Sequence, residues 1–394
     1  MAKQFNIPRS YRSDVIGRIK TKRSSADPRK TDLTPTPLTI GPVTFLVARF
    51  FGFCYGVENA IEIAYRALEE NPDKRIFLLS EMIHNPHVNE DLLSRGVKFL
   101  QTADGEELFP VSNLRSDDVV IIPAFGTTQE IVGHLRRQGL DPQTYNATCP
   151  FVEKVWKRGR QIGEQGFSVV IHGKHSHEET RATFSQVQPA APCVVIRDFA
   201  EASLLTRYIR EELPSEQFYA DFEGRYSQGF DANRDLQKVG VINQTTMLAE
   251  ETRAIAQLIR EALHDRYGAE DLPNHFADTR DTLCYATSEN QRAMKALLEC
   301  EADIAVIVGG YNSSNTSHLV ELCEGRIPAF YIKDADEIIS RQTIRHLDMK
   351  KGVVECTNWL PEKDSTRILV SAGASCPDAM VEEVIERIAN LFVT

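Results

Sequence analysis

A repeated alternation of apolar runs and amphipathic stretches is the feature that most restricts how this chain folds. From Val43 onward, short runs rich in Val, Ile and Leu are each followed by a small or polar turn and then by a stretch of helical period. Strands that alternate with helices in this way form parallel βαβ units, so we expect an α/β protein with mainly parallel sheets. Its sites should lie in the turns at the carboxyl ends of the strands. The expected strands are VTFLVA from Val43, RIFLLS from Arg75, VVIIPA from Val119, SVVIHG from Ser168, VGVINQ from Val239, IAVIVGG from Ile304 and RILVSAG from Arg367.

Length, charge and cysteine content exclude several classes of protein. With 394 residues, the chain is long enough for two to four domains. It contains no run of about 18 uncharged apolar residues, so we expect no membrane role. A net charge of -11 argues against nucleic-acid binding. Eight cysteines are too few for a disulfide-rich secreted scaffold of this length, and we expect the thiols to be reduced.

Two segments depart from the repeating pattern. Residues 1–40 carry nine basic and three acidic side chains, a net charge of +6, which leaves -17 on residues 41–394. We interpret this segment as a basic N-terminal tail; a transit peptide is the alternative, although such peptides are nearly free of acids. Residues 214–235 are polar and spotted with aromatic residues, which indicates an inserted, peripheral surface loop.

Three cysteines share one local context, because each precedes an amphipathic stretch at an expected helix start. They are Cys54, Cys149 and Cys284. The free N–H groups and positive dipole of a helix start favour anionic sulfur and lower the pKa of a thiol. No C-x-x-C occurs in the chain, which argues against a zinc ribbon or a bacterial ferredoxin run. Three such thiolates from three α/β lobes would hold a [4Fe–4S] cluster with one open iron, a Lewis acid. Cys376, which precedes a proline, is a weaker candidate for a chemical role.

The polar turns after the strands carry the other candidate groups. The turn His172–Glu179 contains three imidazoles and two carboxylates, which favours a proton-delivery site with Glu179 as the acid and His177 holding it. A zinc site and an ordinary solvated loop are the alternatives. The turn Tyr311–Ser317 offers hydroxyls and amides at a helix start, which is typical of a phosphate cradle but also of ordinary helix caps. Comparable turns contain His84, Thr245 and Ser375.

Taken together and in this order, the motifs resemble those of the hydroxymethylbutenyl diphosphate reductase (LytB) family. The resemblance extends from about Val43 to Pro377, through RFFGFCYGV, IHN, ATCPFV, HSHEET, NQTT, LCYAT, YNSSNTS and SAGAS. It implies three α/β lobes around a pseudo-threefold axis, with an Fe–S cluster at the centre. The corresponding boundaries are a tail at 1–40, a first lobe at 41–148 whose first strand is free to join the third lobe, a second lobe at 149–283 containing the 214–235 insertion, and a third lobe with the C-terminal segment at 284–394.

The resemblance also assigns roles to individual residues. It implies that Cys54, Cys149 and Cys284 hold one [4Fe–4S] cluster per chain. His84, Ser313, Ser314, Asn315 and Ser375 match the diphosphate-binding positions. His177 and Thr245 lie near the substrate hydroxyl, and Glu179 matches the proton-supplying acid. The implied reaction is a reductive dehydroxylation that takes two electrons and two protons and gives isopentenyl and dimethylallyl diphosphates, the last step of the non-mevalonate isoprenoid pathway.

One departure from the family pattern is visible at Phe125. Bacterial members have a His in a Ser-Ala-His-Gly turn, where this chain has Pro123-Ala124-Phe125-Gly126, so one diphosphate donor is missing. Thr127 and Thr128 are both possible replacements. With the tail and the insertion, this points to the cyanobacterial and plastid branch, hence to ferredoxin as electron donor and to the cyanobacterial cytoplasm or, alternatively, the plastid stroma. We further expect a flexible basic tail to steer an acidic ferredoxin toward the acidic body.

Two competing functions remain open from the sequence. A non-redox Fe–S hydro-lyase acting on a phosphorylated small molecule would remove hydroxide at the open iron without reductant. A non-enzymatic Fe–S sensor would need neither Glu179 and Thr245 nor a diphosphate cradle on separate turns. Reductant-dependent turnover separates these functions from the reductase.

Overall fold

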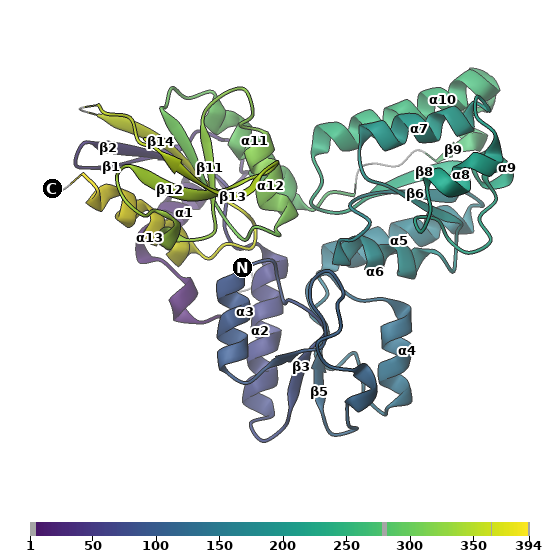
Figure 1. The fold of residues 1–394 in the computed structure, drawn as a ribbon, viewed down its shortest axis with the longest axis horizontal. Helices are drawn as coiled ribbons and strands as arrows, with labels where there is room; N and C mark the ends of the chain where they lie inside the picture. The colour runs from purple at the N-terminus through teal and green to yellow at the C-terminus, as the bar shows by residue number, and fades with distance from the viewer. Residues whose placement is uncertain (1–4, 278–281, 364, 393–394) are drawn as a thin grey trace. The chain divides into compact units, whose positions relative to one another are not determined.

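Two compact units make up the structure, a computed structural model that describes residues 5–277, 282–363 and 365–392 (Figure 1). Unit 1 contains the described residues of Met1–Glu62, Ile83–Asp91 and Tyr285–Thr394, and unit 2 contains Ile63–Met82 and the described residues of Leu92–Cys284. Helices α2 (Tyr55–Glu70) and α3 (Pro86–Ser94) contain residues of both units. No described helix combines the length and apolar character needed to cross a membrane.

Unit 1 is built on a five-stranded sheet in the order β1-β2-β14-β10-β11, parallel except for the β1–β2 pair. The contacting helix pairs α1–α13 and α11–α12 cover it, and Val47, Val308 and Val370 are fully buried in its core. The strands are β1 (Thr36–Ile40), β2 (Val43–Val47), β10 (Ile304–Val308), β11 (Ala329–Ile332) and β14 (Thr366–Ala372), with a separate antiparallel hairpin of β12 (Thr343–Asp348) and β13 (Gly352–Thr357). The helices are η1 (Arg9–Tyr11), α1 (Asp14–Ala26), α11 (Tyr285–Leu298), α12 (Ser314–Glu321), η3 (Ala335–Glu337) and α13 (Asp378–Asn390).

Unit 2 contains two further parallel sheets, in the orders β4-β3-β5 and β7-β6-β8-β9. In Figure 1, helices α7 and α10 cover one face of the second sheet, and α5 and α6 cover the other. The strands are β3 (Ile76–Leu78), β4 (Lys98–Phe99), β5 (Val119–Ile121), β6 (Ser168–His172), β7 (Cys193–Ile196), β8 (Val239–Asn243) and β9 (Phe276–Ala277). The helices are η2 (Val111–Asn113), α4 (Gln129–Arg137), α5 (Pro150–Glu164), α6 (Glu178–Val187), α7 (Phe199–Ile209), α8 (Ser215–Asp221), α9 (Ala232–Asp235) and α10 (Ala249–His275).

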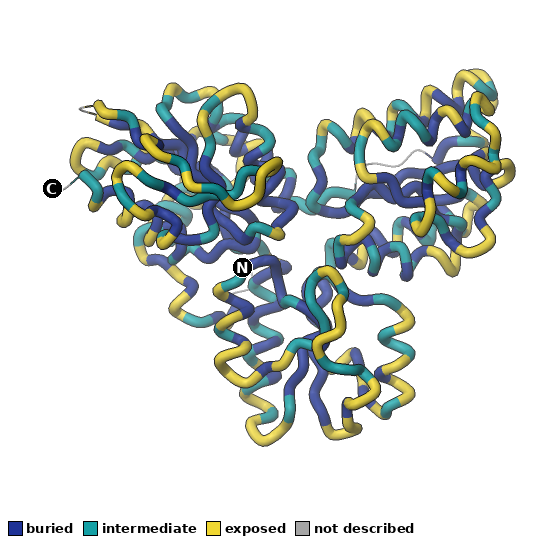
Figure 2. Tube along the Cα trace, in the orientation of Figure 1, coloured by how far each residue is buried: buried dark blue, intermediate teal, exposed yellow. Residues whose placement is uncertain are grey.

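The predicted α/β fold with mainly parallel sheets is confirmed. Every one of the seven expected apolar runs contains a strand, and all of these strands except β2 and β14 are buried at every position (Figure 2). The first expected strand, β2, pairs with β14 in the sheet of the C-terminal segment. The division into three lobes around a central axis stays a prediction.

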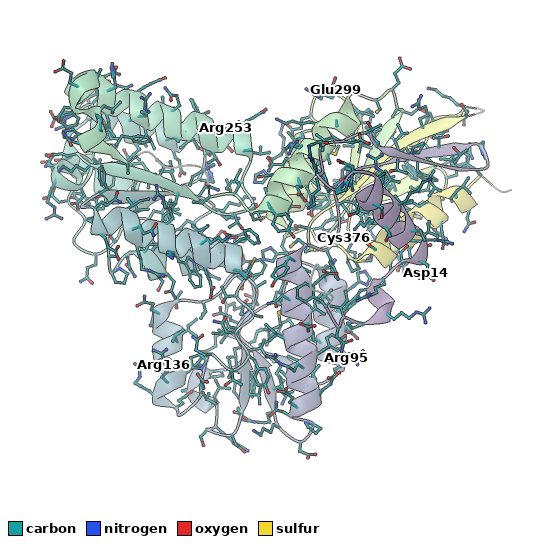
Figure 3. The ribbon with its side chains drawn as sticks, turned by 180° about the vertical axis from the view of Figure 1, so that it is seen from behind. Asp14, Arg95, Arg136, Arg253, Glu299 and Cys376 are labelled. Atoms are coloured by element: carbon teal, nitrogen blue, oxygen red, sulfur yellow. The ribbon has the colours of Figure 1, made fainter. Side chains whose placement is uncertain are left out.

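The two unusual segments are folded, contrary to expectation. Residues 14–26 form α1, which starts at Asp14 (Figure 3), and its Ile16 is fully buried in the core of unit 1. A flexible basic arm is therefore wrong as a description of this segment. The expected surface loop at 214–235 instead forms α8 and α9, and its Phe218 and Phe222 are fully buried. Both corrections have the same cause: single apolar side chains in these polar segments are buried against residues that are distant in the sequence.

Candidate functional site

The acid Glu179 lies where two parallel strands of unit 2 end side by side. His172, the last residue of β6, pairs with Asn243, the last residue of β8, so the turns that follow share one edge of the sheet. The carboxylate of Glu179 accepts hydrogen bonds from the backbone N–H of Thr245 at 2.6 Å and from its Oγ1 at 2.8 Å. Glu179 is only 2% exposed, so this carboxylate is held by Thr245 in a desolvated position.

His177 fixes the start of the helix that carries Glu179. It is the N-cap of α6, and its Nδ1 accepts a hydrogen bond from the backbone N–H of Glu179 at 3.1 Å. Phe125 packs edge-on against the His177 ring, with the ring centroids 5.7 Å apart. Phe125, the departure seen in the sequence, therefore supports His177 by packing. Thr128 is occupied as the N-cap of α4, accepting from the N–H of Ile131 at 3.4 Å.

Two of the three candidate cysteines lie beside this group in unit 2. Cys149 is the N-cap of α5, with Pro150 as the first helical residue, and its backbone N–H donates to the carbonyl of Ala124 at 2.9 Å. Cys284 directly precedes α11, and its N–H donates to the carbonyl of Thr245 at 3.2 Å. Thr245 therefore contacts both residues: its N–H and hydroxyl donate to Glu179, and its carbonyl accepts from the N–H of Cys284.

The expected lowering of the thiol pKa by a helix start is wrong for Cys149. Burial, together with the negative charges of Cys284 and Glu179, raises the pKa of this thiol to about 11. The N–H groups of Phe151 and Val152 act in the predicted direction, but they are outweighed by desolvation. Burial therefore disfavours the thiolate form of free Cys149, and a bound cation would stabilise it.

Unit 1 gathers Cys54 and the predicted phosphate-binding residues around the turn that follows β14. The N–H of Ala374 in this turn donates to Asn315 Oδ1 at 2.9 Å, and its carbonyl accepts from the N–H of Cys54 at 3.2 Å. Ser375 Oγ donates to the carbonyl of His84 at 3.0 Å. One turn thus contacts three of the predicted site positions, because β2, β10 and β14 are neighbours and end at the same edge.

The start of α12 has the form expected of an anion-binding helix end. Ser313 is its N-cap and accepts from the N–H of Thr316 at 3.3 Å. Ser314 Oγ is buried and has no hydrogen-bond partner among the described residues. A Cβ added at Gly310 would lie 2.5 Å from the carbonyl of His84, so only glycine permits this approach of the two loops. A buried hydroxyl without a partner at a helix start fits a phosphate oxygen as its missing acceptor.

Sequence reasoning missed a second layer of polar residues on α11. Asn290 Nδ2 donates to Asn315 Oδ1 at 3.3 Å, and Asn315 Nδ2 donates to Thr287 Oγ1 at 3.4 Å. Both partners are buried, with Thr287 fully so. The sequence did contain a sign of this layer, because Thr287 and Asn290 are three positions apart and so share one helical face that is otherwise apolar. These residues orient the amide of Asn315.

The histidines of the turn His172–Glu179 do not form the zinc site that was one alternative for this turn. Among the described residues, no three or more His, Cys, Asp or Glu side chains are arranged to hold a metal ion. The imidazoles of the predicted zinc alternative serve separate roles: His172 is fully buried beside Thr252, His175 is exposed, and His177 caps α6. Cys376, labelled in Figure 3, is fully buried, and desolvation raises the pKa of its thiol. Burial likewise raises the pKa of Cys193 to about 12.

Comparison with known proteins identifies many relatives. The model of the LytB protein family matches residues 45–389. A 4-hydroxy-3-methylbut-2-enyl diphosphate reductase from Picosynechococcus is 37% identical over 379 residues, which are 96% of this chain and 92% of that protein. The protein of the same name from Synechococcus is 42% identical over 352 residues, which are 89% and 84% of the two chains.

Solved structures show the same fold. A structure described as (E)-4-hydroxy-3-methyl-but-2-enyl diphosphate reductase, the terminal enzyme of the non-mevalonate pathway, has a TM-score of 0.53 and 24% identity, covering 89% of this chain and 100% of that one. The E-1-hydroxy-2-methyl-but-2-enyl-4-diphosphate reductase from Plasmodium falciparum has a TM-score of 0.62 and 19% identity, covering 88% of each chain.

Proposed function

Because the chain belongs to the LytB protein family, we infer that it is an oxidoreductase that converts (E)-4-hydroxy-3-methylbut-2-enyl diphosphate to isopentenyl and dimethylallyl diphosphates. The reaction adds two electrons and two protons to the substrate, breaks its terminal C–O bond and releases water. It is the last step of the non-mevalonate isoprenoid pathway. The observation that carries the assignment to this site is the pairing of a buried carboxylate, Glu179, with Thr245 beside Cys284.

We propose that Cys54, Cys149 and Cys284 hold one [4Fe–4S] cluster per chain. The donor set fits the group, because thiolates are the usual ligands of Fe–S clusters, Cys149 is a half-buried thiol whose ionised form a cation would stabilise, and each cysteine directly precedes a helix. When bound, the cluster supplies electrons and an open iron that acts as a Lewis acid. The proposal rests on family membership together with this chemistry.

The diphosphate is assigned to the residues gathered in unit 1. Ser313, Ser314 and Asn315 present hydroxyl and amide groups at the start of α12, where the helix dipole favours an anion. Ser314 Oγ is buried without a partner, and a phosphate oxygen would accept its hydrogen bond. His84 and Ser375 complete the proposed set and are already joined to one another.

Proton supply is assigned to Glu179 acting with Thr245. A hydroxyl both donates and accepts, so Thr245 Oγ1, 2.8 Å from Glu179 Oε2, can pass a proton from the carboxyl group to a substrate hydroxyl bound beside it. His177 holds the backbone of Glu179 and turns its ring toward Phe125. The departing oxygen thereby leaves as water rather than hydroxide, which lowers the barrier to C–O cleavage.

We further propose an acidic ferredoxin as the electron donor. Arg9 and Arg18 are exposed on the N-terminal segment, which carries a net charge of +6 within residues 1–40. Opposite charge raises the rate of encounter, and salt screens it over about 8–10 Å. Reversing both charges should slow turnover with ferredoxin at low salt and leave turnover with a small chemical reductant unchanged. Equal ferredoxin-driven rates across a salt series would refute this role.

The function is tested with anaerobically prepared protein and the diphosphate substrate. We expect conversion to the two products only when reductant is present, with two electrons consumed for each product molecule. Turnover without reductant, releasing water from the substrate, would instead identify the non-redox hydro-lyase. A protein that binds a cluster but converts no substrate under either condition would favour the sensor.

A further inference from the structure

The N-terminal segment, residues 5–30, lies before the region shared with the LytB family model, which begins at residue 45. It is nevertheless folded onto unit 1. Ser13 caps α1 by accepting from the N–H of Ile16 at 2.8 Å, and Phe5, Tyr11 and Ile16 are all at least 93% buried, being 5%, 7% and 0% exposed. A segment with this much buried apolar surface has a structural task in unit 1.

Its Lys20 contacts the loop that leads to Cys54. Lys20 Nζ donates to the carbonyl of Phe51 at 2.9 Å, forms an ion pair with Asp378 Oδ1 at 2.6 Å, and lies 4.4 Å from the centroid of the Phe51 ring. Gly52 has a φ of +75°, and a Cβ there would lie 2.9 Å from Lys20 Nζ. The loop therefore rests directly on the Lys20–Asp378 pair, in a conformation that glycine permits.

Aromatic side chains of the same segment cover both neighbours of Cys54. Tyr11 packs edge-on against Phe53 with centroids 5.9 Å apart, and Phe5 packs edge-on against Tyr55 at 5.0 Å. Such pairs stabilise by about 0.5–1.5 kcal/mol beyond the area they bury. The residues before and after the cysteine are thus both held by the N-terminal segment.

The far end of the segment is attached next to the helix that follows Cys284. Lys30 Nζ pairs with Glu289 at 2.8 Å and lies 5.5 Å from the centroid of the Tyr285 ring. The hydroxyl of Tyr285 in turn accepts the backbone N–H of Tyr55 at 3.0 Å. The N-terminal segment and α11 therefore hold the Cys54 loop from two sides within unit 1.

We propose that residues 5–30 form a clamp on the loop Phe51–Tyr55, and that Lys20 is the positioning residue that keeps Cys54 in place to bind iron and shields it from oxidants. Cys54 is only partly exposed, so an external reagent reaches it faster whenever this loop opens. Lys20 opposes opening with a charged hydrogen bond to the loop backbone. The statement about iron rests on the proposed function, whereas the clamp itself does not.

The test measures alkylation of Cys54 by iodoacetamide in reduced, cluster-free, full-length protein, quantified by mass spectrometry of its peptide. Lys20→Met keeps the length of the side chain and removes its charge, and should speed alkylation of Cys54 roughly tenfold, since hydrogen bonds to charged groups are among the stronger ones. Lys20→Arg should restore the slow rate, because a guanidinium still bonds the Phe51 carbonyl and Asp378. Lys22→Met removes the same charge from an exposed position of α1 and should change nothing.

Cys323 reports on global unfolding of unit 1, because it is only 1% exposed in the core of that unit. An unchanged Cys54 rate in Lys20→Met would overturn the proposal, and so would equal acceleration of Cys54 and Cys323, which would mean general destabilisation. In cluster-loaded protein, Lys20→Met should lose its visible absorbance in air several-fold faster than Lys22→Met. If the unmodified protein bound no cluster while the alkylation difference persisted, the proposed function would fail and the clamp would stand.

Discussion

Glu179→Gln separates the chemistry of the site from its architecture. Gln has the size of Glu, and its carbonyl oxygen would still accept the N–H of Thr245 that now lies 2.6 Å from Glu179 Oε1. The amide nitrogen would then face Thr245 Oγ1, whose hydroxyl can reverse its role and accept. We therefore expect the free energy of unfolding to change by only about 1 kcal/mol. What Gln cannot do is give a proton to the departing hydroxyl.

Loss of a general acid usually lowers the rate by about 10² to 10⁴. This corresponds to about 2.7–5.5 kcal/mol of activation free energy. The assay is anaerobic turnover with excess chemical reductant, with iron, sulfide and thermal unfolding measured on the same preparations. Glu178→Gln is the matched control: it is the same change one residue earlier in α6, at a buried side chain that lines a cavity of about 480 Å³ with Arg181. We expect this control to keep its turnover.

Turnover of Glu179→Gln within tenfold of the unchanged protein, at equal cluster content, would refute the proton-donor role. Loss of the cluster in Glu179→Gln but not in Glu178→Gln would show that the carboxylate supports the structure of the site instead. Both outcomes are visible in the same set of preparations.

Three further predictions concern binding and stability. Ser314→Ala should raise KM for the diphosphate roughly tenfold or more without loss of stability, because the buried Oγ of Ser314 has no partner among the described residues. Ser317→Ala is the control and should leave KM unchanged, because the Oγ of Ser317 already donates to the Ser313 carbonyl. Equal KM values for the two variants in steady-state kinetics would contradict the assignment of Ser314. The hydrogen bond of His87 to Asp334 at 3.2 Å raises the pKa of His87, so this pair stabilises the fold fully below the ordinary value of 6.5 and the effect is lost as pH rises through the raised pKa. The thermal stability advantage over His87→Asn should therefore shrink from pH 6 to pH 9, and a constant difference would count against it. Phe218→Ala should cost about 3–5 kcal/mol in urea unfolding, because this ring is fully buried against Phe222 and Phe230; a loss below about 1 kcal/mol would exclude a core role.

Seven of the strands were predictable because parallel strands are buried on both faces, although β7, which is also buried at every position, was not predicted. β6, β8 and β10 are buried at every position, so each reads in the sequence as an unbroken apolar run. The hairpin β12–β13 was missed, since nearly all of its residues are half-buried or exposed and several are charged. β4 and β9 contain two residues each, too few for any period to register.

The sequence predicted that polar turns would meet at one edge of a sheet, but not which side chains would contact one another there. Glu179 and Thr245 meet although 66 positions separate them, because each follows one of two neighbouring strands, β6 and β8. The βαβ pattern predicts that the turns after parallel strands meet at one edge of a sheet, but the structure shows that β6 and β8 are neighbours, with β7 on the other side of β6. The roles of His177 as a helix cap and of Phe125 as its packing partner required the coordinates.

The burial of individual side chains was the property that the local sequence predicted least well. The helix start at Cys149 was predicted correctly, and its N–H groups do lower the pKa of the thiol, yet desolvation outweighs them. The same limit explains α1 and the segment at 214–235, where Ile16 and Phe218 are fully buried among side chains from other parts of the chain. A polar neighbourhood in the sequence says little about which single apolar residue is enclosed by distant elements.

The central proposal is that Cys54, Cys149 and Cys284 hold one Fe–S cluster, and the iron and acid-labile sulfide content of single Cys→Ser variants tests it most directly. Protein reconstituted anaerobically should contain about four iron atoms per chain, and Cys54→Ser, Cys149→Ser and Cys284→Ser should each lose most of this iron. Cys193→Ser, at a fully buried thiol in β7, should retain it. Full cluster content in any one of the first three variants would contradict the account.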